Sequence, residues 1–289
     1  MVESSVEIIS IKDDKFNPEY LSQYHLVTCL STHSIEVGVV DMIDNRILAL
    51  ERYPINGIGS HESYVESLNS VFENHYFLKA GYWKSINVVI NNDKMTLLPK
   101  ELFVDTYARE YLKLNCELNF VYDRIFYNDI DKLDIVNIYS IHNRVFDWLK
   151  DIYVGRKINF LHTSHLCILS CFKNDISSKF KITISLHDNY LMIVIMKDNK
   201  LNFCNSFRII SNEDVRYFSQ AIIQQFSINK NQCSVEVFVS PENEERLNML
   251  NESFGHIKKG NRCDSKTFSF VFDEIAEHNF FNICHVPFD

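Results

Sequence analysis

The chain has 289 residues, a length that predicts about two domains. Hydrophobic residues make up 46% and charged residues 23%, a balance typical of a soluble globular protein rather than a disordered one. The formal net charge is −9 without a basic stripe, which argues against nucleic acid as a partner. Only 7 residues are glycine, where an average chain of this length would have about 20. That shortage disfavours sites that need several glycines to bring backbone against phosphate.

Apolar runs and cysteines bear on where the protein resides. The longest strongly apolar run, 190–196, is far shorter than the roughly 20 residues that a membrane span needs. The first residues lack the basic start and apolar stretch of a signal peptide. The 8 cysteines are scattered and include no C-x-x-C pair. We therefore expect a cytoplasmic protein with reduced, mostly buried thiols and no transmembrane segment.

The first half of the chain opens with three short strands. β-Branched and apolar residues separated by turns predict these strands, and Ser60 can then cap a helix that runs to about Leu78. A fourth strand follows the helix. The predicted strands cover residues 24–31, 34–41, 46–53 and 84–91.

The same order recurs in the second half. A helix over 211–227 opens with Ser211 in a start that resembles a capping box, and it lies between a third and a fourth strand. Leu26 aligns with Ile182, and an Asp-Asn turn recurs at Asn45 and Asn199. A chance recurrence of a common order is the alternative to duplication, and the matched turns favour duplication. The predicted strands cover residues 179–187, 190–196, 200–207 and 233–240.

Further elements lie between the two repeats. No Pro/Gly-rich linker separates the halves, so we expect two lobes in close contact. Residues 1–175 would form the first lobe with an inserted αβ segment, and 176–289 the second. The phenylalanine-rich stretch after Gly260 is expected to pack on the second half. The intervening segments are predicted as a helix over 99–115, strands over 120–128 and 133–140, a helix over 141–153, a strand over 157–161 and an apolar helix over 163–173.

Residues 200–207 (KLNFCNSF) and 213–218 (EDVRYF), with support from 38–41 and 97–103, carry a resemblance to a known family. Two βββαβ units in tandem are the organisation of the actin-like ATPase superfamily. More closely, the chain resembles an uncharacterised family of Bacteroidetes bacteria with this fold, domain of unknown function 3822. The resemblance covers most of the chain. It implies an α/β protein with mixed sheets and two actin-like, ribonuclease H-like lobes, and it assigns no substrate.

In active members of that superfamily, the first hairpin of each lobe holds the phosphates of a nucleotide. Such a loop needs an acid for Mg²⁺, glycine for close approach, and N–H or hydroxyl donors. The first hairpin here, 31–34 (STHS), has hydroxyls but neither acid nor glycine, and the second, 187–190 (HDNY), has one acid and no glycine. Where the adenosine side usually has two glycines, residues 240–245 read SPENEE, whose three acids repel an anionic nucleotide. We therefore expect neither ATP nor Mg²⁺ as a cofactor. Any residual ligand binding is expected at Ser31, Thr32, Asp188 and Asn189.

One segment contains residue types that bind metals, namely His162, His165, Cys167 and Cys171. On a helix the two histidines share a face, whereas Cys167 points away from them. A buried apolar helix with core thiols is the better interpretation. We therefore expect no metal site, and we assign no catalytic residue.

Tyr82 and Trp83, in a loop before a strand, are the candidate contacts for a protein partner, since Tyr and Trp favour interfaces. The leading hypothesis is a protein that has lost nucleotide hydrolysis and acts as a protein-binding or scaffold module, with a homodimer as one form. The alternative is a binder or enzyme that uses the interlobe cleft for a nucleotide or small anion. A third interpretation follows from the scaffold members of the superfamily, namely docking to a membrane-associated machine through a short partner peptide.

Overall fold

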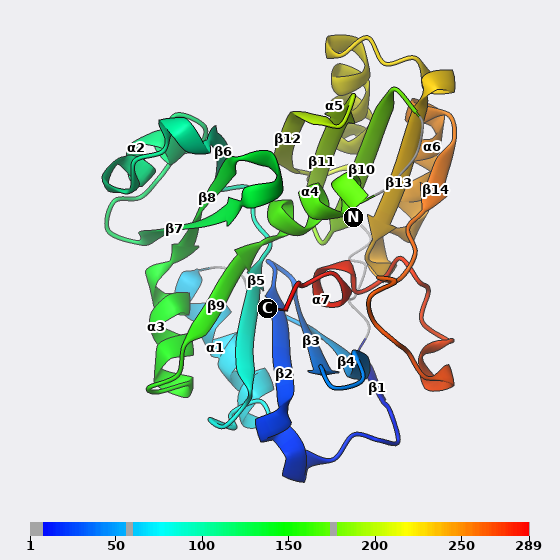
Figure 1. Cartoon of the computed structure of the whole chain (residues 1–289). Coiled ribbons are helices and arrows are strands. Elements are labelled where there is room, and N and C mark those ends of the chain that lie inside the picture. Colours follow the sequence, from blue (N-terminus) through cyan, green and yellow to red (C-terminus); the bar gives the residue numbers. More distant parts are fainter. Residues whose placement is uncertain (1–7, 56–59, 174–177, 289) are drawn as a thin grey trace.

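The computed structural model describes residues 8–55, 60–173 and 178–288. It shows two lobes, each built on a mixed β-sheet, with a smaller layer beside the junction between them (Figure 1). The predicted α/β class is confirmed. Each strand predicted for the two repeats is present, and its bounds differ from the prediction by at most one residue at each end.

The sheet of the first lobe has the strand order β1-β4-β3-β2-β5-β9. Strands β2, β3 and β4 form an antiparallel meander, while β5 runs parallel to β2 and β9 parallel to β5. Helices α1 (His61–Glu73) and α3 (Asn143–Ile152) share a hydrophobic core with one face of this sheet, and Ser60 caps α1 as predicted. The strands are β1 (Ile9–Lys12), β2 (Tyr24–Leu30), β3 (Ser34–Asp41), β4 (Arg46–Pro54), β5 (Ser85–Ile90) and β9 (Ile158–His162).

The sheet of the second lobe has the order β12-β11-β10-β13-β14 and repeats the same arrangement. Here too an antiparallel meander is followed by a strand, β13, that runs parallel to the first strand of the meander. Asn45 and Asn199 both adopt a left-handed backbone, so the matched turns share this conformation. Helices α5 (Asn212–Gln225) and α6 (Leu247–Phe254) cover one face, and α4 (Thr163–Lys173) covers the other. The strands are β10 (Phe180–His187), β11 (Tyr190–Lys197), β12 (Lys200–Arg208), β13 (Cys233–Val239) and β14 (Ile257–Lys259).

An inserted layer of three antiparallel strands, in the order β6-β8-β7, lies beside the two lobes. The helix predicted over 99–115 is wrong for most of its length, because only α2 (Ala108–Lys113) is α-helical. Leu97 and Leu98 pair with β8 instead, and Pro99, which has no N–H to donate, ends this edge strand. The strands are β6 (Met95–Pro99), β7 (Asp123–Ile130) and β8 (Ile135–His142).

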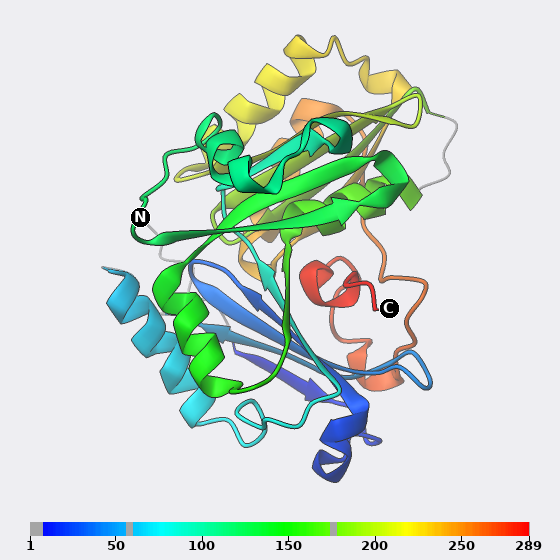
Figure 2. The same ribbon diagram turned by 60° about the vertical axis from the view of Figure 1, so that its left-hand side comes forward.

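The phenylalanine-rich C-terminal stretch packs mainly on the first lobe, so the prediction that it packs on the second half is wrong. Its helix α7 (Phe281–Cys284) lies on β2 and β3, between the two sheets (Figure 2). The stretch also contacts the second lobe: the ring centroid of Phe281 lies 4.3 Å from that of Phe238, and His278 pairs with Glu244. The reason is that helices cover both faces of the second sheet, whereas the β2–β3 face of the first sheet would otherwise be bare.

Gly38 permits this close packing of α7. A Cβ atom at position 38 would lie 2.1 Å from Cγ2 of Ile283, which is shorter than any real contact between these atoms. The glycine therefore allows the C-terminal helix α7 to pack closely on β3. In the described ranges, no helix is long and apolar enough to cross a membrane.

Candidate functional site

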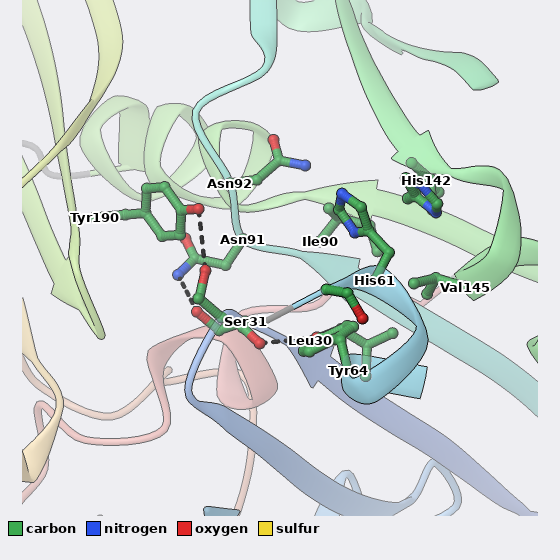
Figure 3. Close-up of a pocket in the computed structure, with 13 residues that line it drawn as sticks. Leu30, Ser31, His61, Tyr64, Ile90, Asn91, Asn92, His142, Val145 and Tyr190 are labelled. Carbon is green, nitrogen blue, oxygen red and sulfur yellow. Dashed lines mark hydrogen bonds between the residues drawn. The ribbon is translucent and has the colours of Figure 1, made fainter. Parts of the chain in front are cut away.

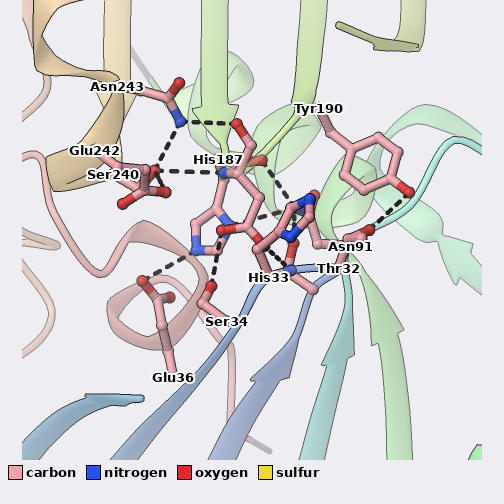
Figure 4. Close-up of polar contacts among 12 residues, drawn as sticks. Thr32, His33, Ser34, Glu36, Asn91, His187, Tyr190, Ser240, Glu242 and Asn243 are labelled. Atoms are coloured by element: carbon pink, nitrogen blue, oxygen red, sulfur yellow. Dashed lines mark hydrogen bonds and ion pairs between the residues drawn. The ribbon is translucent and has the colours of Figure 1, made fainter. Parts of the chain in front are cut away.

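The β2–β3 and β10–β11 hairpins, one from each lobe, meet in direct contact. The backbone N–H of His33 donates to Oδ2 of Asp188 at 2.7 Å, and the hydroxyl of Ser34 donates to Oδ1 at 2.9 Å. Beside them, the hydroxyl of Thr32 donates to the Tyr190 hydroxyl at 3.0 Å. The two loops that would hold phosphates in an active actin-like ATPase thus bind each other (Figure 4).

Asp188 provides the central group of this contact. It adopts a left-handed backbone at φ 52°, a conformation that aspartate tolerates better than most residues, and its carboxylate is fully buried. Burial alone would raise the pKa of this carboxyl, but His187, Arg52 and the N–H of His33 oppose burial and hold the pKa well below its usual value. Asp188 is therefore an anion, bound by an N–H, a hydroxyl and a guanidinium. Donors of these kinds also suit a phosphate oxygen.

Arg52 of β4 joins carboxylates from both lobes. Its Nη1 donates to Oε1 of Glu36 at 2.6 Å, and its Nη2 donates to Asp188 at 3.1 Å and to Glu242 at 2.7 Å. Only 1% of the Arg52 side chain is exposed, and the three carboxylates raise its pKa against the opposing effect of burial. The planar guanidinium presents five N–H donors in a fixed fork, so it can hold these three carboxylates in fixed directions.

His187 completes the group of buried charges. Its Nε2 lies 3.0 Å from Oε1 of Glu36, and its Nδ1 lies 3.3 Å from Nδ2 of Asn91. Burial would lower the pKa of this imidazole, but the neighbouring Glu36 carboxylate raises it. We call Glu36, Arg52, His187, Asp188 and Glu242 the interlobe ion cluster. Glu36 and Arg52 come from the first lobe, and the other three come from the second.

The segment on the expected adenosine side also binds the second hairpin. Nδ2 of Asn243 donates to the backbone carbonyl of Asp188 at 2.9 Å. The hydroxyl of Ser240 donates to Glu242, which in turn accepts from Arg52. Residues 240–243 therefore hydrogen-bond to Asp188 and Arg52 of the interlobe ion cluster. They occupy the segment in which glycines are expected in a nucleotide-binding relative.

The remaining candidate ligand residues take structural roles. Oγ of Ser31 accepts a hydrogen bond from Asn91 at 2.8 Å, and the Ser31 carbonyl accepts one from the Tyr64 hydroxyl at 2.8 Å. The carbonyl of Asn189 accepts from the N–H of Ile209 at 2.8 Å. Thr32 and Asp188 therefore join the lobes. Ser31 ties its hairpin to Asn91 and to α1 and also contributes a hydrogen bond to Asp188, whereas Asn189 ties its hairpin to Ile209 of its own lobe.

A pocket of about 360 Å³ lies beside the hairpins, between the start of α1 and the end of β8 (Figure 3). The rings of His61 and His142 stack there with centroids 3.7 Å apart. Burial and the neighbouring His61 lower the pKa of His142 to about 4, and burial lowers that of His61, so both are neutral at pH 7. Among the described residues, no Lys, Arg, Asp or Glu lines the pocket. Its apolar wall consists of Leu30, Ile90, Ile141 and Val145.

The expectation that Trp83 offers an exposed contact is wrong. Trp83 is fully buried and packs against Phe77, with ring centroids 5.6 Å apart, because the loop before β5 turns inward to fill the core of the first lobe. Its neighbour Tyr82 is 57% exposed. Of the two predicted partner contacts, only Tyr82 is accessible.

The histidines and cysteines of this segment are buried, as the sequence predicts: His162 ends β9, and His165, Cys167 and Cys171 lie on α4. Nδ1 of His162 lies 2.8 Å from the Ser164 hydroxyl, and its Nε2 lies 3.2 Å from the Asn92 carbonyl. Cys167 and Cys171 are buried, and burial raises the pKa of both thiols. These groups are already packed or hydrogen-bonded within the core.

Comparison with known proteins defines the fold and the family. The model of a family described as a protein of unknown function (DUF3822) matches residues 13–257. None of the curated proteins matches. A protein of Bacteroides thetaiotaomicron with an actin-like ATPase fold and unknown function superposes with a TM-score of 0.75 at 21% identity, covering 85% of this chain and 93% of that one. The PilM-PilN complex of type IV pilus biogenesis gives a TM-score of 0.52 at 8% identity, covering 85% and 90%. The predicted family and the predicted actin-like ATPase fold are both confirmed.

Proposed function

The chain belongs to the DUF3822 family of proteins of unknown function, and we propose that it has lost nucleotide hydrolysis and acts by binding another protein. The observation that carries the first part is the carboxylate of Asp188. It accepts hydrogen bonds from His33 and Ser34 of the first hairpin and from Arg52 of β4, donors that would otherwise be open to a phosphate. The Asp188 carboxylate therefore occupies the hydrogen-bond donors that a phosphate would need.

Charge strengthens this proposal. A triphosphate would have to displace Asp188 from its donors and then lie beside Glu36 and Glu242, two further carboxylates. Arg52 is already shared by all three acids, so it has little positive charge left to offer. Neither hairpin contains a glycine that would let the backbone approach a phosphate. The negative charges and the glycine-free backbone of the hairpins therefore both disfavour nucleotide binding.

The inserted layer supports the second part, binding to a protein. Large apolar side chains are exposed at many positions of this layer and its connecting loops, and exposed aromatic residues are enriched at protein interfaces. A structural neighbour with the same fold was itself solved as a complex of two proteins, PilM and PilN. Tyr82, on the first lobe, is a separate candidate contact. The exposed residues of the layer are Leu102, Val104, Tyr107, Leu114, Phe120, Val121, Tyr122 and Tyr127.

Thermal unfolding of the full chain with and without Mg-ATP tests the loss of nucleotide binding. We expect an unchanged midpoint, because the His33 N–H and the Ser34 hydroxyl already donate to Asp188, and the Thr32 hydroxyl donates to Tyr190. A rise in the midpoint at micromolar Mg-ATP would overturn the proposal. Sedimentation of the purified protein then distinguishes a second copy of the chain from a different protein as the occupant of the inserted layer.

The pocket beside the hairpins, lined mainly by the first lobe and the inserted layer with Tyr190 from the second lobe, favours a second candidate, binding of a small molecule. Because no charged side chain among the described residues lines it, an uncharged ligand suits it better than a nucleotide or a small anion. Ligand-observed NMR with adenosine and with ATP separates the two cases. Signals from adenosine alone support the uncharged class, and signals from ATP support the anionic one.

A further inference from the structure

Cys29, Glu36 and His187 bring three metal-binding side chains together beneath the hairpins. Each residue offers one ligand atom: a thiol sulfur, a carboxylate oxygen and an imidazole nitrogen. These three atoms lie within 4.8 Å of one another, and all three residues are buried. Cys29 and Glu36 come from adjacent strands of the first lobe, whereas His187 ends a strand of the second. Figure 4 shows Glu36 extending from β3 to the imidazole of His187.

One carboxylate oxygen of Glu36 has no hydrogen-bond partner among the described residues, which suggests that the three side chains bind a further ligand. Oε1 accepts from Arg52, but Oε2 is buried and has no hydrogen-bond partner among residues 8–55, 60–173 and 178–288. A buried carboxylate oxygen without a partner is rare, because its desolvation is uncompensated. The carboxylate of Glu36 therefore has one buried oxygen available for a further ligand.

We propose that Cys29, Glu36 and His187 bind a zinc ion that joins the two lobes. Sulfur, nitrogen and oxygen donors together suit Zn²⁺ better than Mg²⁺ or Ca²⁺, which prefer oxygen. Zinc-to-ligand distances of about 2.0 to 2.3 Å place the ligand atoms roughly 3.5 Å apart. The side chains therefore need to adjust by only about 1 Å from the separations present here.

The neighbours of the three ligands leave one oxygen of Glu36 to the ion, because Arg52 can remain on Oε1 while Oε2 binds zinc. The carboxylate of Asp188, whose Oδ1 lies 3.8 Å from Nδ1 of His187, adds a nearby negative charge that attracts the cation. Zinc would release the thiol proton of Cys29, because the thiolate is the form of cysteine that binds the metal.

Zinc content and cobalt spectroscopy of the full chain test this site. Protein expressed with supplemented zinc is expected to contain one zinc per chain, and X-ray absorption is expected to show a single sulfur among the ligands. Replacement of zinc by Co²⁺ should give a sulfur-to-cobalt charge-transfer band. Cys29→Ser should lose that band and weaken binding by more than the roughly 10 to 100-fold expected when only a supporting residue is lost.

A matched variant controls for loss of a core thiol. Cys167 is fully buried on α4 and outside the site, so Cys167→Ser should retain zinc and the cobalt band. If Cys29→Ser does not fold, the single sulfur in wild-type absorption data still decides the question. Wild-type protein without stoichiometric zinc, zinc without a sulfur ligand, or a charge-transfer band that survives Cys29→Ser would each overturn the proposal.

Discussion

The carboxylate of Asp188, in the second lobe, accepts a 2.7 Å hydrogen bond from the backbone N–H of His33, in the first. This contact joins the two hairpins that face each other in the actin-like fold. A carboxylate of the chain itself therefore joins the two lobes at these hairpins. The interlobe ion cluster should accordingly stabilise the fold. Loss of one of its residues should lower the free energy of unfolding, which can be measured without any ligand.

Replacing Asp188 by alanine should destabilise the protein strongly. The change leaves the N–H of His33 without its partner and removes one of three carboxylates from the buried Arg52. Breaking a buried ion pair typically costs about 3 to 5 kcal/mol. Urea unfolding provides the measurement, with Asp131→Ala as the control, because Asp131 forms an exposed pair with Lys100 and should cost less than about 1 kcal/mol. Equal losses for the two variants would contradict the assigned role of Asp188.

Replacing Arg52 by lysine should also destabilise, although the charge is kept. One ammonium cannot bond to Glu36, Asp188 and Glu242 with the geometry of the guanidinium, so we expect a loss of about 2 to 4 kcal/mol. Arg216→Lys, which changes an exposed pair with Glu252, should alter stability by less than about 0.5 kcal/mol. Wild-type stability in Arg52→Lys would show that the three-carboxylate arrangement is unimportant.

Glu51 should make stability sensitive to acid. Burial would raise the pKa of its carboxyl, but hydrogen bonds from His75, at 2.6 Å, and Lys12, at 2.9 Å, lower it from 4.5 to about 2. The folded-state value lies below the unfolded one, so this stabilisation is complete above about pH 5 and is lost as pH falls through 4.5 toward 2. The shift corresponds to about 3 kcal/mol.

Unfolding free energies of wild type and Glu51→Gln between about pH 7 and pH 2 test this prediction. The difference between the two proteins should be largest near neutral pH and should shrink in acid, because the glutamine carries no charge. Glu73→Gln serves as the control, since Glu73 is exposed. A difference that stays constant over the whole range would exclude the proposed role of Glu51.

The exposed apolar side chains of the inserted layer should be needed for partner binding. Phe120 and Tyr127 are 62% and 45% exposed, and loss of an interface residue that contributes 2 kcal/mol or more weakens binding more than about tenfold. We expect proteins retained from a lysate of the source organism by the wild type to be lost with Phe120→Ser/Tyr127→Ser. Tyr217→Ser, which removes a 67% exposed ring on α5, should retain them. Equal retention by all three proteins would contradict a role for the layer.

The strands of both lobes could be predicted because short apolar runs alternate with turns such as those at Asn45 and Asn199. Strand β6 could not, because Leu97 and Leu98 become a strand only through pairing with β8, which lies some 40 residues further along the chain. The position of α7 depended on which sheet face lacked a helix layer, and a single sequence does not contain that information directly. Gly38 was the available signal, since a glycine inside a strand indicates close approach of another segment.

For the site, Asp188 could be identified from its place in the second hairpin, whereas the roles of Glu36 and Arg52 could not. A charged residue in a strand usually faces solvent, and the partners of these two lie partly in the other lobe. One signal was present in the sequence. Glu36 interrupts a strand that is apolar or small on both faces, so it is buried and requires a buried counter-charge. The meeting of Cys29 with His187 depended on how the lobes pack and could not be read from spacing.

Calorimetric titration of Mg-ATP into the full wild-type chain tests the central claim most directly. Because Asp188 occupies the donors of His33 and Ser34 in the first hairpin and of Arg52 in β4, we predict no binding heat up to about 1 mM Mg-ATP. Such a result would mean that any Kd for Mg-ATP is weaker than about 1 mM. Saturable binding in the micromolar range, with Mg²⁺ required, would contradict the account.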